Sequence, residues 1–167
     1  MKHTLPLLMA VGARLPENKE WLREKMAHYI EEEVGHQEWI LSDIAQCGSD
    51  AEIVRHAVPS LPVELMISFI WDFVSRRNPV GFLGMVFVLE GTSVNVATQA
   101  ADKIRLALQL PKKAFSYLYS HGSLDIEHID FFESVVNKID DKRDQDDIIH
   151  VAKIIFRLYA DMFRVIK

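Results

Sequence analysis

The chain has 167 residues, of which 49% are hydrophobic and 26% charged, an ordinary composition for one globular domain that buries its own core. We therefore expect a single domain over residues 1–167. The formal net charge of -5, with no run of more than two basic residues, argues against nucleic-acid binding. The single cysteine, Cys47, excludes an internal disulfide and indicates a reducing, cytoplasmic compartment.

Helical periodicity dominates the first third of the chain. A short apolar helix is expected from His3 to Arg14, and a long helix from about Asn18 to Gln46. Gly48 is placed to terminate this long helix. Ser49 to Glu52 forms a capping-box pattern that opens a short helix ending near residue 57.

The rest of the chain is also expected to be helical, because no strand pattern is convincing. The predicted helices cover residues 60–77, 79–110, 112–119, 121–139 and 144–165. The second of these is apolar in its first half, but its apolar run is too short to span a bilayer, and we expect no membrane association. The sum is an all-α bundle of about seven helices.

The most specific motif is His121-x3-Asp125-x2-His128. Offsets of four and three residues place three side chains on one face of a helix. A carboxylate between two imidazoles is a ligand set for iron, manganese or zinc. The alternative is that Ser123 caps the start of this helix and Asp125 serves only the helix dipole.

Further candidate ligands lie upstream. Glu33 and His36 form a Glu-x-x-His unit of the kind that di-iron helical bundles use, and Glu32 is an equally suitable carboxylate. The alternative is a solvated acidic helix face. Glu90 follows the apolar run 80–89, and a buried carboxylate must be protonated, paired or metal-bound. Its alternative is a polar stripe that faces solvent, or a pair with an arginine.

The order of His36, Glu90 and the triplet that begins at His121 resembles the heme-oxygenase-like di-iron oxidase and oxygenase superfamily. This fold is shared with the thiaminase II (TenA) and pyrroloquinoline-quinone synthase (PqqC) groups. The resemblance implies a seven-helix bundle, here with a short N-terminal helix, that binds two irons and activates dioxygen on a small, partly apolar substrate. Manganese or another divalent metal is an alternative. The implied ligands are Glu33, His36, Glu90, His121, Asp125 and His128.

Two departures from the family pattern keep another function open. Some relatives carry a carboxylate seven residues before the histidine, where this chain has Tyr29, and relatives usually have a longer first helix. These differences favour a degenerate or non-enzymatic bundle that binds a metal or a small ligand.

Large apolar side chains also occur on more than one side of two predicted helices, namely Trp71, Phe156, Tyr159 and Phe163. Exposed apolar patches mark contacts between proteins, and twofold dimers are the commonest homo-oligomers. We therefore expect a homodimer.

Overall fold

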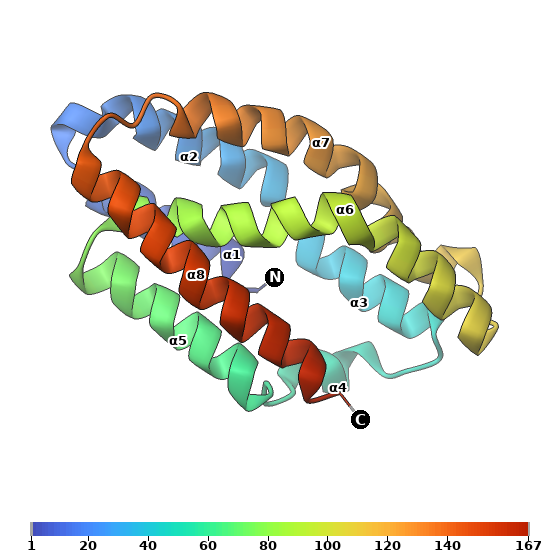
Figure 1. The fold of residues 1–167 in the computed structure, drawn as a ribbon. Coiled ribbons are helices and arrows are strands. Elements are labelled where there is room, and N and C mark those ends of the chain that lie inside the picture. Colours follow the sequence, from blue (N-terminus) through green and yellow to red (C-terminus); the bar gives the residue numbers. More distant parts are fainter. Residues whose placement is uncertain (1, 167) are drawn as a thin grey trace.

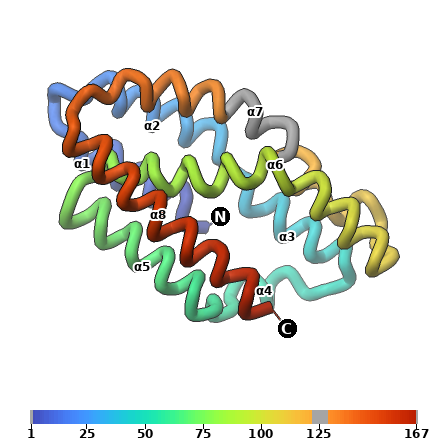
Figure 2. Tube along the Cα trace, viewed as in Figure 1, coloured from blue at the N-terminus to red at the C-terminus, as the bar shows by residue number. Residues whose placement is uncertain are grey.

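The computed structural model describes residues 2–166, with the side chains of residues 2–121 and 129–166 (Figure 2). Within this range it contains eight α-helices and no β-strand. The helices are α1 (Thr4–Arg14), α2 (Glu20–Glu33), α3 (His36–Gln46), α4 (Ala51–His56), α5 (Leu61–Arg76), α6 (Phe82–Leu108), α7 (Ser116–Val136) and α8 (Lys142–Arg164). The predicted all-α bundle is confirmed, and the eight helices are close to the expected number of about seven.

Helix α6 runs through the middle of the molecule, with α2 and α7 on one side and α5 and α8 on the other (Figure 1). It packs along both α7 and α8. A Cβ atom at Gly84 would lie 2.3 Å from the carbonyl oxygen of Ile148 and 2.7 Å from the amide nitrogen of Ala152. Glycine is therefore required where the backbones of α6 and α8 meet.

The main hydrophobic core joins α1, α2, α5 and α8 to the first half of α6 and the second half of α7. Its fully buried side chains include Leu7, Ile70, Phe73, Val151 and Ile155. A second, much smaller cluster contains Ala101, Ala114 and Phe115. This cluster lies at the other end of the bundle, where α3, the end of α6 and the start of α7 come together (Figure 1).

The segment Pro79–Leu108 is long and apolar enough to cross a membrane when only length and composition are considered, with a mean hydropathy of 1.6. The expectation that no stretch reaches this length is wrong by that criterion. Half of the apolar window is nevertheless buried inside the bundle, and the core helices of globular proteins pass the same test.

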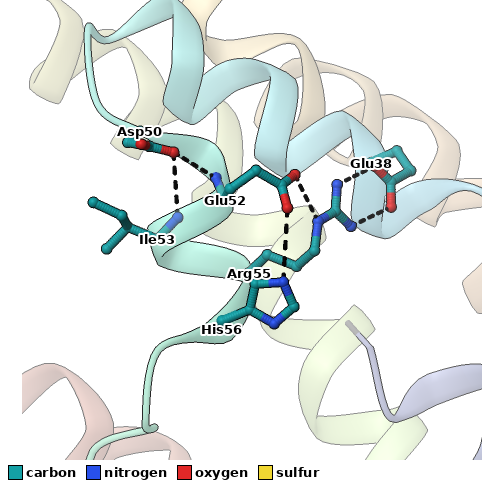
Figure 3. Close-up of polar contacts among 6 residues, drawn as sticks. All are labelled: Glu38, Asp50, Glu52, Ile53, Arg55 and His56. Carbon is teal, nitrogen blue, oxygen red and sulfur yellow. Dashed lines mark hydrogen bonds and ion pairs between the residues drawn. The ribbon is translucent and has the colours of Figure 1, made fainter.

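Two predicted helix starts also differ from the structure. Asp50, and not Ser49, is the N-cap of α4, because its carboxylate accepts hydrogen bonds from the backbone amides of Glu52 (2.8 Å) and Ile53 (3.3 Å) (Figure 3). Helix α7 begins at Ser116, five residues before the predicted start, because the expected helix 112–119 is a single 3-10 turn (Lys112–Phe115) that leads directly into α7.

Helix α4 is attached to α3 by a surface ion pair (Figure 3). The guanidinium of Arg55 donates two hydrogen bonds to the Glu38 carboxylate, at 2.7 and 2.8 Å, and a third to Glu52 at 2.9 Å. These bonds raise the pKa of Arg55 and, together with the charge of Arg55, lower the pKa of Glu38. No residue of α4 is buried, and this ion pair links the helix to α3 at the surface.

Only part of the apolar surface expected for a dimer is exposed. Trp71 and Tyr159 are partly buried and pack against the main core. Phe156 and Phe163 are on the surface of α8, with 58% and 53% of their area exposed. The homodimer stays a prediction that now depends on these two phenylalanines.

Candidate metal centre

A break between α2 and α3 builds the first part of the site. The prediction of one continuous helix from Asn18 to Gln46 is wrong, because α2 ends at Glu33 and α3 begins at His36. Between them Gly35 has a φ of 92°, a left-handed conformation that side chains disfavour. A Cβ atom there would meet nothing within 4 Å, so the backbone angle, not the available space, requires glycine.

The break turns the Glu-x-x-His unit into a corner. Glu33 is the last residue of α2 and His36 the first of α3. Their side chains meet with His36 Nδ1 3.5 Å from Glu33 Oε2, and both are buried. The solvated acidic face considered as the alternative therefore does not describe Glu33.

His121 joins this pair from α7. Only 6% of His121 is exposed, and its ring centroid lies 4.9 Å from that of His36. One ligand atom from each of Glu33, His36 and His121 can be chosen so that all three lie within 4.8 Å of one another. Three helices thus place two imidazoles and one carboxylate at a single buried point.

The backbone of α7 sets the orientation of the His121 ring. Nδ1 of His121 lies 3.0 Å from the carbonyl oxygen of Tyr117. A carbonyl oxygen can only accept, so Nδ1 carries the proton and Nε2 is the atom that can bind a metal. Metal-binding histidines commonly have such a backbone partner on the other ring nitrogen.

Aromatic rings surround the two imidazoles. The Tyr117 ring lies 3.8 Å from the His121 ring between centroids, and the Trp39 ring lies 4.6 Å from that of His36. Trp39 also contacts His121, at 6.3 Å, and is 40% exposed. The indole therefore lies beside both imidazoles and is partly exposed to solvent.

The donor set fits iron. Two neutral imidazoles and one carboxylate are the protein ligands typical of non-heme Fe(II) sites, which keep further positions open. With metal–ligand bonds of about 2.1 Å, neighbouring ligand atoms of such a facial set are about 3.0 Å apart. The 4.8 Å limit observed for Glu33, His36 and His121 thus requires a contraction of up to about 2 Å on metal binding.

Glu90 lies in a neighbouring pocket between α2, α6 and α7. The pocket has a volume of only about 10 Å³, is partly open to solvent and is lined by Met26, Tyr29, Leu83, Val86, Glu90, Phe131, Phe132 and Val135. The Oε2 atom of Glu90 is buried. Glu90 is not part of the cluster formed by Glu33, His36 and His121. The pocket is nevertheless close to that cluster, because Tyr29 on its wall is one helical turn before Glu33.

The remaining carboxylate and imidazole candidates are placed as follows. Glu32 points its buried Oε2 inward and has its other oxygen 3.3 Å from Nε2 of His28. The side chains of Asp125 and His128 lie outside the described part of the structure. The predicted role of Ser123 as a helix cap is wrong, because α7 begins seven residues earlier, at Ser116. The next α7 residue with a described side chain, Ile129, would be 4.0 Å from a Cβ atom at Gly91, so α6 and α7 are in contact beside Glu90.

The sequence alone did not indicate Asp43, Tyr117 or Trp39 as part of this region. Asp43 is buried and accepts hydrogen bonds from the Ser116 hydroxyl (2.6 Å) and from the Tyr117 backbone amide (2.8 Å). A signal was present in the spacing, because Asp43 follows His36 by seven residues, two turns along the same face of α3.

The fold defined by these helices is heme oxygenase-like. The chain is similar to a solved protein from Shewanella denitrificans OS217, described as a domain of unknown function with a heme oxygenase-like fold and determined by crystallography at 2.30 Å resolution. The two are 24% identical with a TM-score of 0.81, and the match covers 98% of this chain and 72% of that one. No curated protein matches this chain.

The family itself is more specific than the fold. The model of the family described as "Iron-containing redox enzyme" matches residues 1–160, nearly the whole chain. The chain therefore belongs to this family of iron-containing redox enzymes, and a redox-type role is supported. The predicted resemblance to the heme-oxygenase-like superfamily is confirmed.

Proposed function

We propose that this protein is a non-heme iron oxidase or oxygenase that uses dioxygen to oxidise a small, partly apolar substrate. The observation that carries the proposal is the buried set of two imidazoles and one carboxylate that α2, α3 and α7 bring together. Membership of the iron-containing redox family supports both the metal and the type of reaction.

In this proposal Glu33, His36 and His121 would hold one iron ion. Bound iron would supply the open coordination positions at which dioxygen reacts. The Glu33 carboxylate would offset part of the metal charge in a site with little access to water. The Tyr117 carbonyl keeps the proton on Nδ1 of His121, so that Nε2 stays available to the metal.

A second iron would use the remaining candidates, Glu90 with Asp125 and His128, and Glu32 is a further carboxylate close by. The buried Oε2 of Glu90 on the face of α6 toward α2 and α7 supports this part of the proposal. Two metal ions would also explain why several carboxylates occur in this region, because buried negative charges are costly unless they are neutralised.

The pocket beside Glu90 has a mostly apolar wall that includes Phe131 and Phe132. Its volume of about 10 Å³ is the space of one water molecule and far below the roughly 300–1,000 Å³ of usual ligand pockets. Binding of a substrate at this point therefore requires the surrounding side chains to move.

Anaerobic titration with Fe(II) tests the proposal. The parent protein should bind iron at micromolar metal and develop new absorbance when oxygen is admitted. Glu33→Gln, His36→Ala and His121→Ala should each weaken binding by at least about tenfold. His56→Ala is the matched control, because the His56 side chain is 76% exposed on α4. The proposal is wrong if the parent binds no iron, or if the three variants bind iron as well as the control does.

The number of irons needs a separate pair of variants. Glu90→Gln keeps the shape of the side chain and removes its charge, so the fold should persist while the stoichiometry falls from two ions to one. His128→Ala should have the same effect. Elemental analysis of the purified variants measures this directly, and an unchanged ratio of iron to protein would exclude a role for both residues.

A non-enzymatic bundle that binds metal without dioxygen chemistry is the second candidate. Tyr29, at the position where some relatives have a carboxylate, favours it, since the structure places this buried tyrosine on the wall of the Glu90 pocket. Iron binding with no oxygen-dependent absorbance and no oxygen consumption would support this candidate against the first.

A further inference from the structure

Helix α3 is unusual in what it buries. All of its residues are described, and the only two that are buried are His36 and Asp43, both polar. Its apolar residues Ile40, Leu41 and Ile44 are only partly buried, and Trp39 is exposed. Apolar burial therefore contributes little to fixing the position of this helix against α7.

Polar contacts supply what apolar packing does not. Helix α7 begins without a capping side chain of its own, because its N-cap residue is Phe115. The Asp43 carboxylate takes that place from α3 by accepting from the Ser116 hydroxyl and from the Tyr117 amide, one of the amides that a helix start leaves unsatisfied. A negative charge at this end of a helix is also favoured by the macrodipole.

Both ends of this contact lead to the candidate ligands. On α3, Asp43 is two turns after His36. On α7, Tyr117 donates a hydrogen bond from its amide to Asp43 and accepts a hydrogen bond from Nδ1 of His121 at its carbonyl. One carboxylate thus ties the helix that carries the first imidazole to the turn that orients the second.

We propose that Asp43 is a positioning residue that sets the separation of the His36 and His121 rings and holds His121 with its proton on Nδ1. This inference rests on the proposed metal site, but the contacts it invokes are present without a metal. Asp43 acts through its hydrogen bonds with Ser116 and Tyr117.

The test measures Co(II) binding to the full chain by calorimetry and by the visible spectrum of the bound ion. Asp43→Ala should weaken Co(II) binding by about 10–100-fold, the usual effect of losing an outer partner of a metal ligand. Asp43→Asn should stay within about threefold of the parent, because its amide oxygen can accept from Tyr117 and its NH2 group can donate to the Ser116 oxygen. An Asn variant as weak as the Ala variant would overturn the proposal.

A matched control separates positioning from general loss of a helix cap. Asp141 is the N-cap of α8 and accepts from the Arg143 amide at 2.8 Å, away from the candidate ligands. Asp141→Ala should lower the melting temperature and leave Co(II) affinity unchanged. If Asp141→Ala and Asp43→Ala weaken Co(II) binding equally, Asp43 has no positioning role.

A metal-free readout distinguishes failure of this inference from failure of the proposed function. In protein with 15N-labelled histidine, long-range nitrogen–proton spectra identify the protonated ring nitrogen, and His121→Gln assigns the signal. The parent should show His121 with its proton on Nδ1, and Asp43→Ala should shift it toward a mixture of both forms. A parent that binds no Co(II) would end the metal-site proposal, whereas an unchanged His121 signal in Asp43→Ala would end this one.

Discussion

The two ends of the bundle are held together by different kinds of interaction. At one end, α1, α5 and α8 bury large apolar side chains such as Ile70 and Phe73 almost completely. At the other end, the small cluster around Phe115 is the apolar core, and α3 contributes His36 and Asp43. The candidate site lies where the ends meet, since Glu33 closes α2 and His36 opens α3.

This contrast indicates a division of labour. Apolar burial scales with area and has no direction, so the main core can fix the fold without fixing the angle of any single ring. Hydrogen bonds have direction and orient the imidazoles, but they contribute less free energy of folding. Functional elements are often drawn from such less stable parts of a protein.

The largest expected effect is a disruption of the main core at the contact between α6 and α8. Gly84→Ala forces a methyl group against the carbonyl of Ile148, and overpacking of this kind should lower the free energy of unfolding by about 3 kcal/mol. Gly91→Ala on the same helix is the control, because its nearest neighbour is 4.0 Å away. Urea denaturation measures both, and equal stabilities would show that α6 and α8 do not touch as described.

Metal binding should stabilise mainly the end of the bundle that contains α3. A ligand present at 100 times its dissociation constant stabilises the protein that binds it by about 2.7 kcal/mol. Hydrogen exchange should therefore slow by up to about 100-fold in residues 36–46, which form α3, when Zn(II) or Co(II) is added. Exchange in residues 61–76, which form α5 in the main core, should change much less. Uniform slowing in both segments would contradict a difference in local stability between the two ends.

The next prediction concerns the predicted homodimer and the exposed apolar surface of α8. Ile149, Phe156 and Phe163 follow one another at intervals of seven residues and are each at least half exposed, which forms an apolar stripe along α8. We propose that a second copy of the chain covers it. Phe156→Ser should then weaken dimerisation by about 2 kcal/mol. Light scattering at micromolar concentration measures the mass, and a monomeric parent would exclude the dimer.

A glycine pair tests the corner between α2 and α3. Gly35→Ala and Gly48→Ala both introduce a side chain at positive φ in open space, and each should cost about 1 kcal/mol of stability. Of the two glycines, only Gly35 lies between Glu33 and His36. Only Gly35→Ala should therefore also weaken metal binding, by about tenfold. Calorimetry with Co(II) distinguishes the two, and equal affinities would show that the corner does not set the site.

The smallest effect concerns pH and the attachment of α4. Because Arg55 lowers the pKa of Glu38 in the folded state, the ion pair stabilises the protein fully above the ordinary pKa of 4.5. Its contribution is lost as pH falls through the lower folded-state pKa. The methyl signals of Ile53 on α4 should therefore shift in NMR spectra below pH 4.5, and Glu38→Gln should abolish this shift. A shift that persists in Glu38→Gln would assign it to another group.

Periodicity and composition were sufficient to predict an all-α bundle, because amphipathic spacing and proline positions are local properties of the chain. The same is true of the start of α5 at Ser60 and of its end before Asn78 and Pro79. The predicted association of Glu33 with His36 was also local. The two residues meet across a break between helices, however, and not on one continuous helix as expected.

Only the tertiary structure decided how distant residues meet. Nothing near His121 in the sequence specifies that α7 packs against α3, that Asp43 caps α7, or that Trp39 lies beside both imidazoles. Such contacts join residues more than 70 positions apart, and they follow from how whole helices pack rather than from the pattern within any one of them. The sequence by itself thus determined the all-α class and which residues could bind metal, but not the break between α2 and α3 or the start of α7. The packing of α2, α3 and α7 decided that Glu33, His36 and His121 share one buried point, because only a corner at Gly35 and a close helix contact can bring their side chains together.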